Sequence, residues 1–258
     1  HHLNAGAAGI TDPAERIALV RLNLQAARLA KSATAFAAAI DLLEVATTQL
    51  GPDGWEAEYE LAYELYHELI ECEYFDGHFA RAEARIEPML SHMRTDLQRA
   101  SVLRLRMMIY TSQGQFQQAL FAGQQGLKLL GIELPQTAPE CQQAFMGEVI
   151  AIEQRINSTG MAALLESPPM ADPEQLTISG LLSDMALSAY QVAPPLAAFL
   201  IARGVRLALT YGHSSSSAQS YVTYGLLLAG LLGRYADALA LGRSEEHTSE
   251  LQSLRHIS

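Results

Sequence analysis

The acidic residues around His67 form the pattern in this sequence that comes closest to a metal site. Glu64 and His67 make a Glu-x-x-His motif, and Glu60, Glu68 and Glu71 lie nearby. On a helix this motif can supply two ligands to a di-iron centre, but such a centre needs a second copy and further inward-facing carboxylates. The sequence contains no second copy. We therefore interpret these residues as a charged, solvated helix face, and we expect neither a metal nor another cofactor.

Other catalytic patterns are missing from the sequence. It has no Gly-x-x-x-x-Gly-Lys phosphate loop, no Gly-x-Gly-x-x-Gly fingerprint and no Gly-x-Ser-x-Gly nucleophile elbow. The 2 cysteines, Cys72 and Cys141, form no Cys-x-x-Cys pair, which excludes a disulfide framework and a structural zinc site. We interpret both as small buried apolar residues. The sequence thus predicts no catalytic residue and a non-enzymatic segment, whereas bound metal or turnover in the purified protein would indicate an enzyme.

Tyrosines recur along the helix that we predict for residues 55–75. One apolar stripe on this helix should face its partner helix, and consists of Leu61, Leu65, Leu69 and Cys72. A second stripe, here called the tyrosine stripe, consists of Tyr59, Tyr63, Tyr66, Ile70 and Tyr74. Half-buried tyrosines can anchor a peptide or a partner helix. Packing between adjacent repeats also needs two apolar faces on each helix, and this alternative stays open.

The acidic side chains of the same helix also predict ion pairs. The next helix that should lie beside it carries Arg99, Arg104 and Arg106. We expect pairs between these arginines and the acidic residues at 60, 64, 68 and 71, each contributing no more than about 1 kcal/mol when exposed. Such pairs would set the register of neighbouring repeats.

The pattern Gly-x-aromatic-x-x-Ala recurs along the chain. Its defining residues are Gly77, Phe79 and Ala82, then Gly114, Phe116 and Ala119, then Gly233, Tyr235 and Ala238. A weaker copy covers residues 34–39, and the first three copies recur at intervals of about 40 residues. Glycine lets the chain turn after one helix, the aromatic ring inserts between paired helices, and the small alanine permits their close approach. This combination resembles the tetratricopeptide repeat, whose nominal period is about 34 residues.

The elements that carry these residues are all expected to be helices. Apolar periodicity and turn residues predict helices over 13–30, 33–50, 55–75, 79–93, 95–113, 116–130, 138–157, 174–191, 195–211 and 216–232. Asp12 and Pro13 give the first helix a polar cap and a first-turn proline. The residues 213–217 are interpreted as a turn with a serine N-cap, with a phosphorylation site as the alternative. The predicted fold is an all-α, tetratricopeptide-like solenoid of antiparallel helix pairs.

Composition limits the partners. The chain has 258 residues, 49% of them hydrophobic, which excludes global disorder. Its formal net charge of −11 repels phosphate backbones, so we expect no nucleic-acid partner. No apolar run approaches the ~18 residues of a membrane helix, so we expect no membrane partner and a cytoplasmic location. The remaining partners are a protein, a peptide, or neighbouring domains of the parent chain.

Several further runs resemble one region of very large bacterial signalling proteins. These proteins combine a serine/threonine kinase-like domain, a signal-transduction ATPase domain, a long helical repeat region and a sensor histidine kinase. The likeness covers essentially residues 1–242 and departs at His213, where the family tends to have Asn. It falls entirely in the repeat region of these proteins. The resemblance therefore assigns no catalytic residue to this chain. The runs are 59–61, 69–74, 77–82, 104–107, 110–114, 126–131, 169–173, 211–214 and 221–225.

The resemblance implies a scaffold and sensor arm that couples binding to ATPase and kinase domains by rearrangement of the solenoid. The alternative is the repeat domain of an ATPase-type transcriptional regulator, with a small effector in its concave face. Residues 243–253 resemble the translation of a widely used sequencing adapter. We therefore expect residues 1–242 to be a repeat segment truncated at both ends, and residues 243–258 to be a non-native tail.

Overall fold

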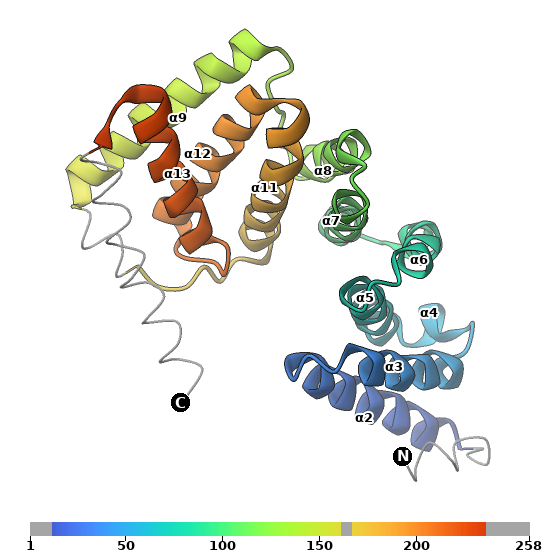
Figure 1. The fold of residues 1–258 in the computed structure, drawn as a ribbon. Coiled ribbons are helices and arrows are strands. Elements are labelled where there is room, and N and C mark those ends of the chain that lie inside the picture. The colour runs from blue at the N-terminus through green and yellow to red at the C-terminus, as the bar shows by residue number, and fades with distance from the viewer. Residues whose placement is uncertain (1–11, 161–166, 236–258) are drawn as a thin grey trace. The chain divides into compact units, whose positions relative to one another are not determined.

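The computed structural model describes residues 12–160 and 167–235, and these residues form only helices, turns and one isolated bridge (Figure 1). This confirms the predicted all-α class, and the helices begin and end within a few residues of their predicted limits. The chain divides into two compact units, His1–Ile109 and Tyr110–Ser258, here called the N-terminal and C-terminal units. Each is described by itself.

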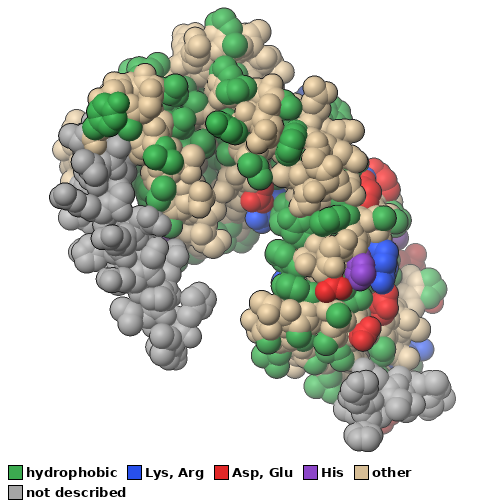
Figure 2. All heavy atoms as spheres, in the orientation of Figure 1, with side chains coloured by type: hydrophobic (Ala, Val, Ile, Leu, Met, Phe, Trp, Pro, Cys, Tyr) green, Lys and Arg blue, Asp and Glu red, His purple; other side chains and the backbone are tan. Residues whose placement is uncertain are grey.

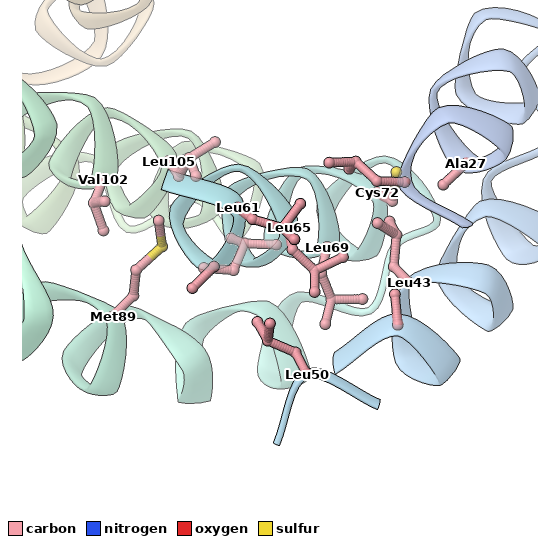
Figure 3. Packing of buried hydrophobic residues seen from close by; sticks show 14 of the residues in the cluster. Ala27, Leu43, Leu50, Leu61, Leu65, Leu69, Cys72, Met89, Val102 and Leu105 are labelled. Carbon is pink, nitrogen blue, oxygen red and sulfur yellow. The ribbon is translucent and has the colours of Figure 1, made fainter. Parts of the chain in front are cut away.

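The N-terminal unit is built around helix α5. Its helices are α2 (Pro13–Ser32), α3 (Phe36–Leu50), α4 (Gly54–Ala57), α5 (Tyr59–Phe75), α6 (Phe79–His92) and most of α7 (Asp96–Ser112). Helix α2 packs on α3, and α5 packs on both α3 and α6. The predicted inward stripe is buried, with Leu65 and Leu69 at 0% exposure, and contacts the apolar side chains of the neighbouring helices (Figure 3). Removal of this apolar surface from water is what holds the helices together.

The repeat pattern places left-handed turn residues between helices. The backbone φ is 81° at Gly77 and 73° at Gly114, a conformation that glycine adopts without a Cβ penalty. Thr34 stands at the same position of the weaker copy, with φ 58°, and it is the only non-glycine residue with positive φ in the described ranges. At Gly77 the following N–H, of His78, donates to the Glu73 carbonyl at 2.8 Å, which closes the end of α5.

The residues after each turn begin the next helix. Phe79 and Phe116 are the first residues of α6 and of α8 (Phe116–Leu129), and both are half-buried. The alanines that follow, Ala82 and Ala119, are 0% exposed. A larger side chain at either alanine would have to displace the helix that packs over it.

The third copy of the pattern lies at the edge of the described residues. Gly233 ends α13 with φ 67°, and Tyr235 is 68% exposed. Ala238 lies outside the described residues, as do the first eleven residues and the expected tail at 243–258.

The helix predicted for residues 55–75 is divided in two. Glu58, with φ −133° and ψ 53°, separates α4 from α5. The change of direction places the Trp55 ring parallel to the His92 ring, with centroids 4.5 Å apart and an interplanar angle of 4°. Trp55 also stacks on Tyr66, at 5.2 Å and 23°. The prediction of one continuous helix was wrong, because helical periodicity carries no information about the packing of Trp55 on His92 and Tyr66.

The C-terminal unit is organised around α12. Its helices are α8 (Phe116–Leu129), α9 (Ala138–Thr159), α11 (Pro173–Val192), α12 (Pro194–Tyr211) and α13 (Ser217–Leu232). Helix α12 packs on α9, α11 and α13, and α11 also packs on α8. The buried Glu148 carboxylate on α9 pairs with Arg206 and, at 3.0 Å, with Arg203, both on α12. Burial raises the pKa of Glu148, although Arg206 opposes this shift.

A backbone bridge joins the segment before α11 to the turn after α12. The N–H of Met170 donates to the His213 carbonyl at 2.8 Å, and the N–H of His213 donates to the Pro168 carbonyl at 3.2 Å. Gly212 has φ 100°, and a Cβ at this position would lie 2.2 Å from the Pro168 oxygen. Glycine is therefore required both by the backbone conformation and by the close approach of the two segments.

The serine turn differs in detail from the expected N-cap. Ser216 precedes α13 but makes no side-chain capping bond. The buried Ser217 hydroxyl instead accepts from the N–H of Ser214 at 2.9 Å, and Ser214 is itself 7% exposed. The hydroxyl of Ser214 also lies 2.9 Å from that of Ser179 on α11. The turn is thus tied into the interior of the unit by hydroxyl groups.

Candidate functional site

The tyrosine stripe of α5 does not form one continuous exposed face. Tyr59 is 8% exposed and Ile70 is 0% exposed, so neither offers surface to a partner. Tyr63, Tyr66 and Tyr74 are half-buried. The stripe therefore separates into interior positions and positions that reach the surface.

Tyr59 connects α5 to the start of α7. Its hydroxyl donates to Gln98 Oε1 at 2.7 Å and accepts from the N–H of Arg94 at 3.1 Å. The Arg94 guanidinium lies 3.7 Å from the centre of the tyrosine ring, in cation–π geometry. The packing interpretation therefore accounts for this member of the stripe.

Tyr66 borders an open groove on the N-terminal unit. The groove has a volume of about 690 Å³ and lies where the turn before α4 and one face of α6 meet around the Trp55 ring. Its lining residues are Pro52, Trp55, Tyr66, Arg81, Ala84, Arg85, Pro88, Met89 and His92. We call it the Trp55 groove. Of the predicted stripe, only Tyr66 belongs to it.

Proline interrupts the backbone hydrogen bonds of the α6 wall of the groove. Pro88 lies inside α6 and has no N–H, so the carbonyl of Ala84 lacks its helical donor. Ala84 and Pro88 are both exposed and both line the groove. A peptide N–H entering the groove would find this carbonyl free of its usual helical bond.

The arginines of the groove are held by a buried carboxylate. Glu73 on α5 is 0% exposed and lies 3.0 Å from the Arg81 guanidinium and 2.9 Å from that of Arg85. Glu44 on α3 pairs with Arg81 and lies 3.7 Å from Arg85. Because two acids face two bases, the formal charges of the cluster cancel. Glu73 was not predicted as a site residue, although its helical spacing from the buried Leu69 would have placed it on the inner face.

The acidic face of α5 pairs with α2. Arg28 binds Glu64 and Glu68 at 2.9 Å each, and Lys31 binds Glu68 at 2.7 Å and Glu71 at 2.6 Å. Burial alone would raise the pKa of Glu68, but the hydrogen bonds from Lys31 and Arg28 outweigh it and lower that pKa. In the described ranges no group of three or more His, Cys, Asp and Glu side chains is arranged to hold a metal ion.

These partners differ from the predicted ones. Arg99 pairs within α7 with Asp96 at 2.9 Å, and Arg106 reaches Glu87 on α6 at 2.5 Å. The expectation that Arg99 and Arg106 pair with the acidic face of α5 was therefore wrong. Helix α2 presents Arg28 and Lys31 along the edge of α5 where Glu64, Glu68 and Glu71 lie. Sequence order alone could not show which neighbouring helix covers that edge.

Both cysteines are buried thiols. Cys72 is 0% exposed, and burial raises its pKa to about 12. Cys141 is 4% exposed, and burial raises its pKa as well. Neither provides a thiolate nucleophile at neutral pH.

The C-terminal unit has an apolar groove of its own, of about 340 Å³. It is lined by Leu182, Ser183, Ala186, Leu187, Tyr190, Leu200, Ile201, Gln219, Ser220 and Thr223. None of these lining residues carries a charge, whereas the Trp55 groove has two arginines. Leu187 and Tyr190 are 57% and 68% exposed, and Figure 2 shows green apolar side chains scattered over the visible face of this unit.

Comparisons with protein-family models, with curated proteins and with solved structures found no match to this chain. Among the helices that the structure describes, none combines the length and the apolar character needed to cross a membrane.

Proposed function

We propose that this chain is a non-enzymatic helical-repeat scaffold that binds a protein or peptide partner and relays that binding to neighbouring domains. In this proposal its parent is a cytoplasmic bacterial signalling protein with kinase and ATPase domains, as the sequence resemblance implies. The observation that carries the binding function is the Trp55 groove, where an aromatic stack and two arginines meet on one surface.

The scaffold part of the proposal is a tetratricopeptide-like solenoid of antiparallel helix pairs. It is supported by the recurring left-handed turn at Thr34, Gly77 and Gly114. It is also supported by the fully buried alanine that follows each turn, such as Ala82 and Ala119. An open array of this kind offers extended surfaces for partners rather than one enclosed active site.

The chemistry of the Trp55 groove suits a peptide. Trp55 is 9% exposed and supports the exposed His92 ring and the half-buried Tyr66 ring from below by stacking. These two rings offer a surface on which proline or aromatic side chains pack well. The Ala84 carbonyl, which lacks an N–H at residue 88, is placed to accept a backbone N–H of the peptide. The Arg81 and Arg85 side chains, 46% and 29% exposed, have further N–H groups beyond those that bind Glu73 and can donate them to carbonyl oxygens. The side chains of Ala84 and Pro88 have almost no rotamer freedom. The groove wall therefore loses little side-chain entropy when a peptide docks on it.

A second candidate function rests on the apolar groove of the C-terminal unit. Its volume of about 340 Å³ lies within the range of small-molecule sites, and its lining is uncharged. The alternative proposal is therefore that the chain is the effector-binding repeat domain of an ATPase-type transcriptional regulator, with a small effector in this groove. The flanking gene sequence discriminates between the two: a histidine kinase core supports the first proposal, and a DNA-binding helix-turn-helix supports the second.

Site-specific photocrosslinking tests the binding function. A photoreactive phenylalanine replaces Ala84 in the groove or, as a matched control, the exposed Ala38 on α3 of the same unit. We expect a defined bacterial protein to crosslink at position 84 and not at 38. We also expect the crosslink from a reporter placed at Pro88 to be lost when Ala84→Trp fills the groove and kept with Ala38→Trp. Equal crosslinking at both positions, or no effect of Ala84→Trp, would refute the groove as the binding surface.

A further inference from the structure

His67 lies where three helices of the N-terminal unit meet. Its Nε2 is 3.0 Å from the Ser101 hydroxyl on α7, within hydrogen-bond distance. Its Nδ1 is 4.0 Å from Glu71 Oε2 on its own helix, and its ring lies against Tyr63 with centroids 5.8 Å apart. Only 24% of the side chain is exposed. The imidazole is thus a polar contact between α5 and α7 that is largely withdrawn from water.

Charged groups from each of these helices face the imidazole. Lys31 on α2 and Arg104 on α7 are cationic, whereas Glu68 and Glu71 on α5 are anionic. Lys31 Nζ holds the same Glu71 oxygen, Oε2, at 2.6 Å that His67 approaches at 4.0 Å. A proton on His67 therefore adds a third positive charge to those of Lys31 and Arg104, beside only two carboxylates. The protonated ring also competes with Lys31 for the same Glu71 oxygen.

We propose that His67 is a pH-sensitive joint, at which proton uptake in mildly acidic solution weakens the contact between α5 and α7. At neutral pH the uncharged ring has one N–H and one acceptor nitrogen, which suits one hydroxyl and one nearby carboxylate. The protonated ring has two N–H groups and no acceptor, so it can only donate to the Ser101 hydroxyl, which also hydrogen-bonds Tyr63. The added charge is also repelled by Lys31 and Arg104 across a partly desolvated space.

The direction of the effect follows from linkage. Burial lowers the pKa of folded His67 below its usual 6.5, and the Lys31 and Arg104 charges add to this against the opposing glutamates. The unfolded chain then binds the proton more readily than the folded chain does. Stability is consequently full above the unfolded pKa and is lost as the pH falls through about 6.5 towards the folded pKa.

Thermal unfolding of the full chain at pH 7.5 and 5.5 tests the joint. We expect the midpoint of the wild-type protein to fall by about 2–4 °C more than that of His67→Gln, which keeps a polar side chain but does not titrate. The control is His78→Gln, which removes a histidine with a 47% exposed side chain whose Nε2 lies 3.1 Å from Asp76. Loss of that pair should not reduce the fall in the unfolding midpoint between pH 7.5 and 5.5, whereas His67→Gln should reduce it. An identical pH dependence in wild type and His67→Gln would overturn the proposal.

Two measurements on the wild-type protein decide the question even where His67→Gln does not fold. The NMR titration of the His67 ring proton should give a midpoint below 6.5, and a midpoint at or above that value would overturn the proposal. Amide hydrogen exchange, corrected for intrinsic rates, should rise in α7 around Ser101 at pH 5.5 relative to pH 7.5. Unchanged protection there would show that protonation does not loosen the α5–α7 contact.

Discussion

Replacement of Gly212 by alanine should destabilise the C-terminal unit for two separable reasons. The first is backbone strain, because Gly212 has φ 100° and ψ 177°, a region that residues with a Cβ rarely adopt. Strain of this kind costs about 1–3 kcal/mol. The second is the new Cβ, which would lie 2.2 Å from the Pro168 oxygen and must push the bridge apart.

The cost of the second effect follows from the bridge itself. Its two backbone hydrogen bonds, Met170 to His213 and His213 to Pro168, contribute about 0.5–1.5 kcal/mol each. Gly160→Ala is the matched control, since Gly160 also ends a helix, with φ 84° and ψ 141°. In the described part of the chain, nothing beyond its chain neighbours lies within 4 Å of a Cβ at Gly160. The two variants share the strain, so Gly212→Ala should cost about 1–3 kcal/mol more.

Urea unfolding followed by far-UV circular dichroism gives the free energies of unfolding of both variants and of the wild type. Amide hydrogen exchange gives the local readout, because the N–H groups of Met170 and His213 donate in the bridge. Both should lose protection in Gly212→Ala and keep it in Gly160→Ala. Two results would refute this reasoning: a loss of stability that is the same in both variants to within about 0.5 kcal/mol, or amide protection that persists in Gly212→Ala. Either would show that a Cβ at position 212 does not break the bridge.

Two further predictions concern buried groups of the N-terminal and C-terminal units. Glu73→Gln should cost about 2 kcal/mol in urea unfolding, because it weakens the charge-assisted bonds that this fully buried carboxylate accepts from Arg81 and Arg85. Glu64→Gln, at a 46% exposed carboxylate, should cost less than about 1 kcal/mol. Equal losses of stability in the two variants would contradict the role assigned to the burial of Glu73. The thiols of Cys72 and Cys141, 0% and 4% exposed, should not react with Ellman's reagent at pH 8 until urea unfolds the chain. Rapid stoichiometric reaction of the native protein would show that the helices around them open readily.

Local sequence patterns predicted the helices and their turns. The left-handed conformations of Gly77 and Gly114 follow from glycine itself, since the absence of a Cβ makes such a turn inexpensive wherever a helix must end. The buried faces of the helices follow from periodicity, as the complete burial of Leu65 and Leu69 confirms. These features depend on residues a few positions apart, whose relative geometry a helix already determines.

The candidate site was only partly accessible to the same reasoning. Tyr66 was predicted as a partner-binding residue and borders the Trp55 groove, whereas Tyr59 and Ile70 of the same stripe are buried. Helical spacing places all three on neighbouring faces of α5 but does not say which segment covers each face. The groove also needs Pro52 and His92, which come from a turn and from a different helix.

Partners across helices were decided by the tertiary structure alone. Sequence order suggested that the glutamates of α5 meet the arginines of α7, yet Arg28 and Lys31 of α2 hold them. The sequence by itself determined that the chain forms helices, where they turn and which of their faces are apolar, because those properties come from local sterics and periodicity. It could not determine which helix edge meets which, since that choice depends on how whole apolar faces pack, and a small rotation of one helix exchanges every charged neighbour.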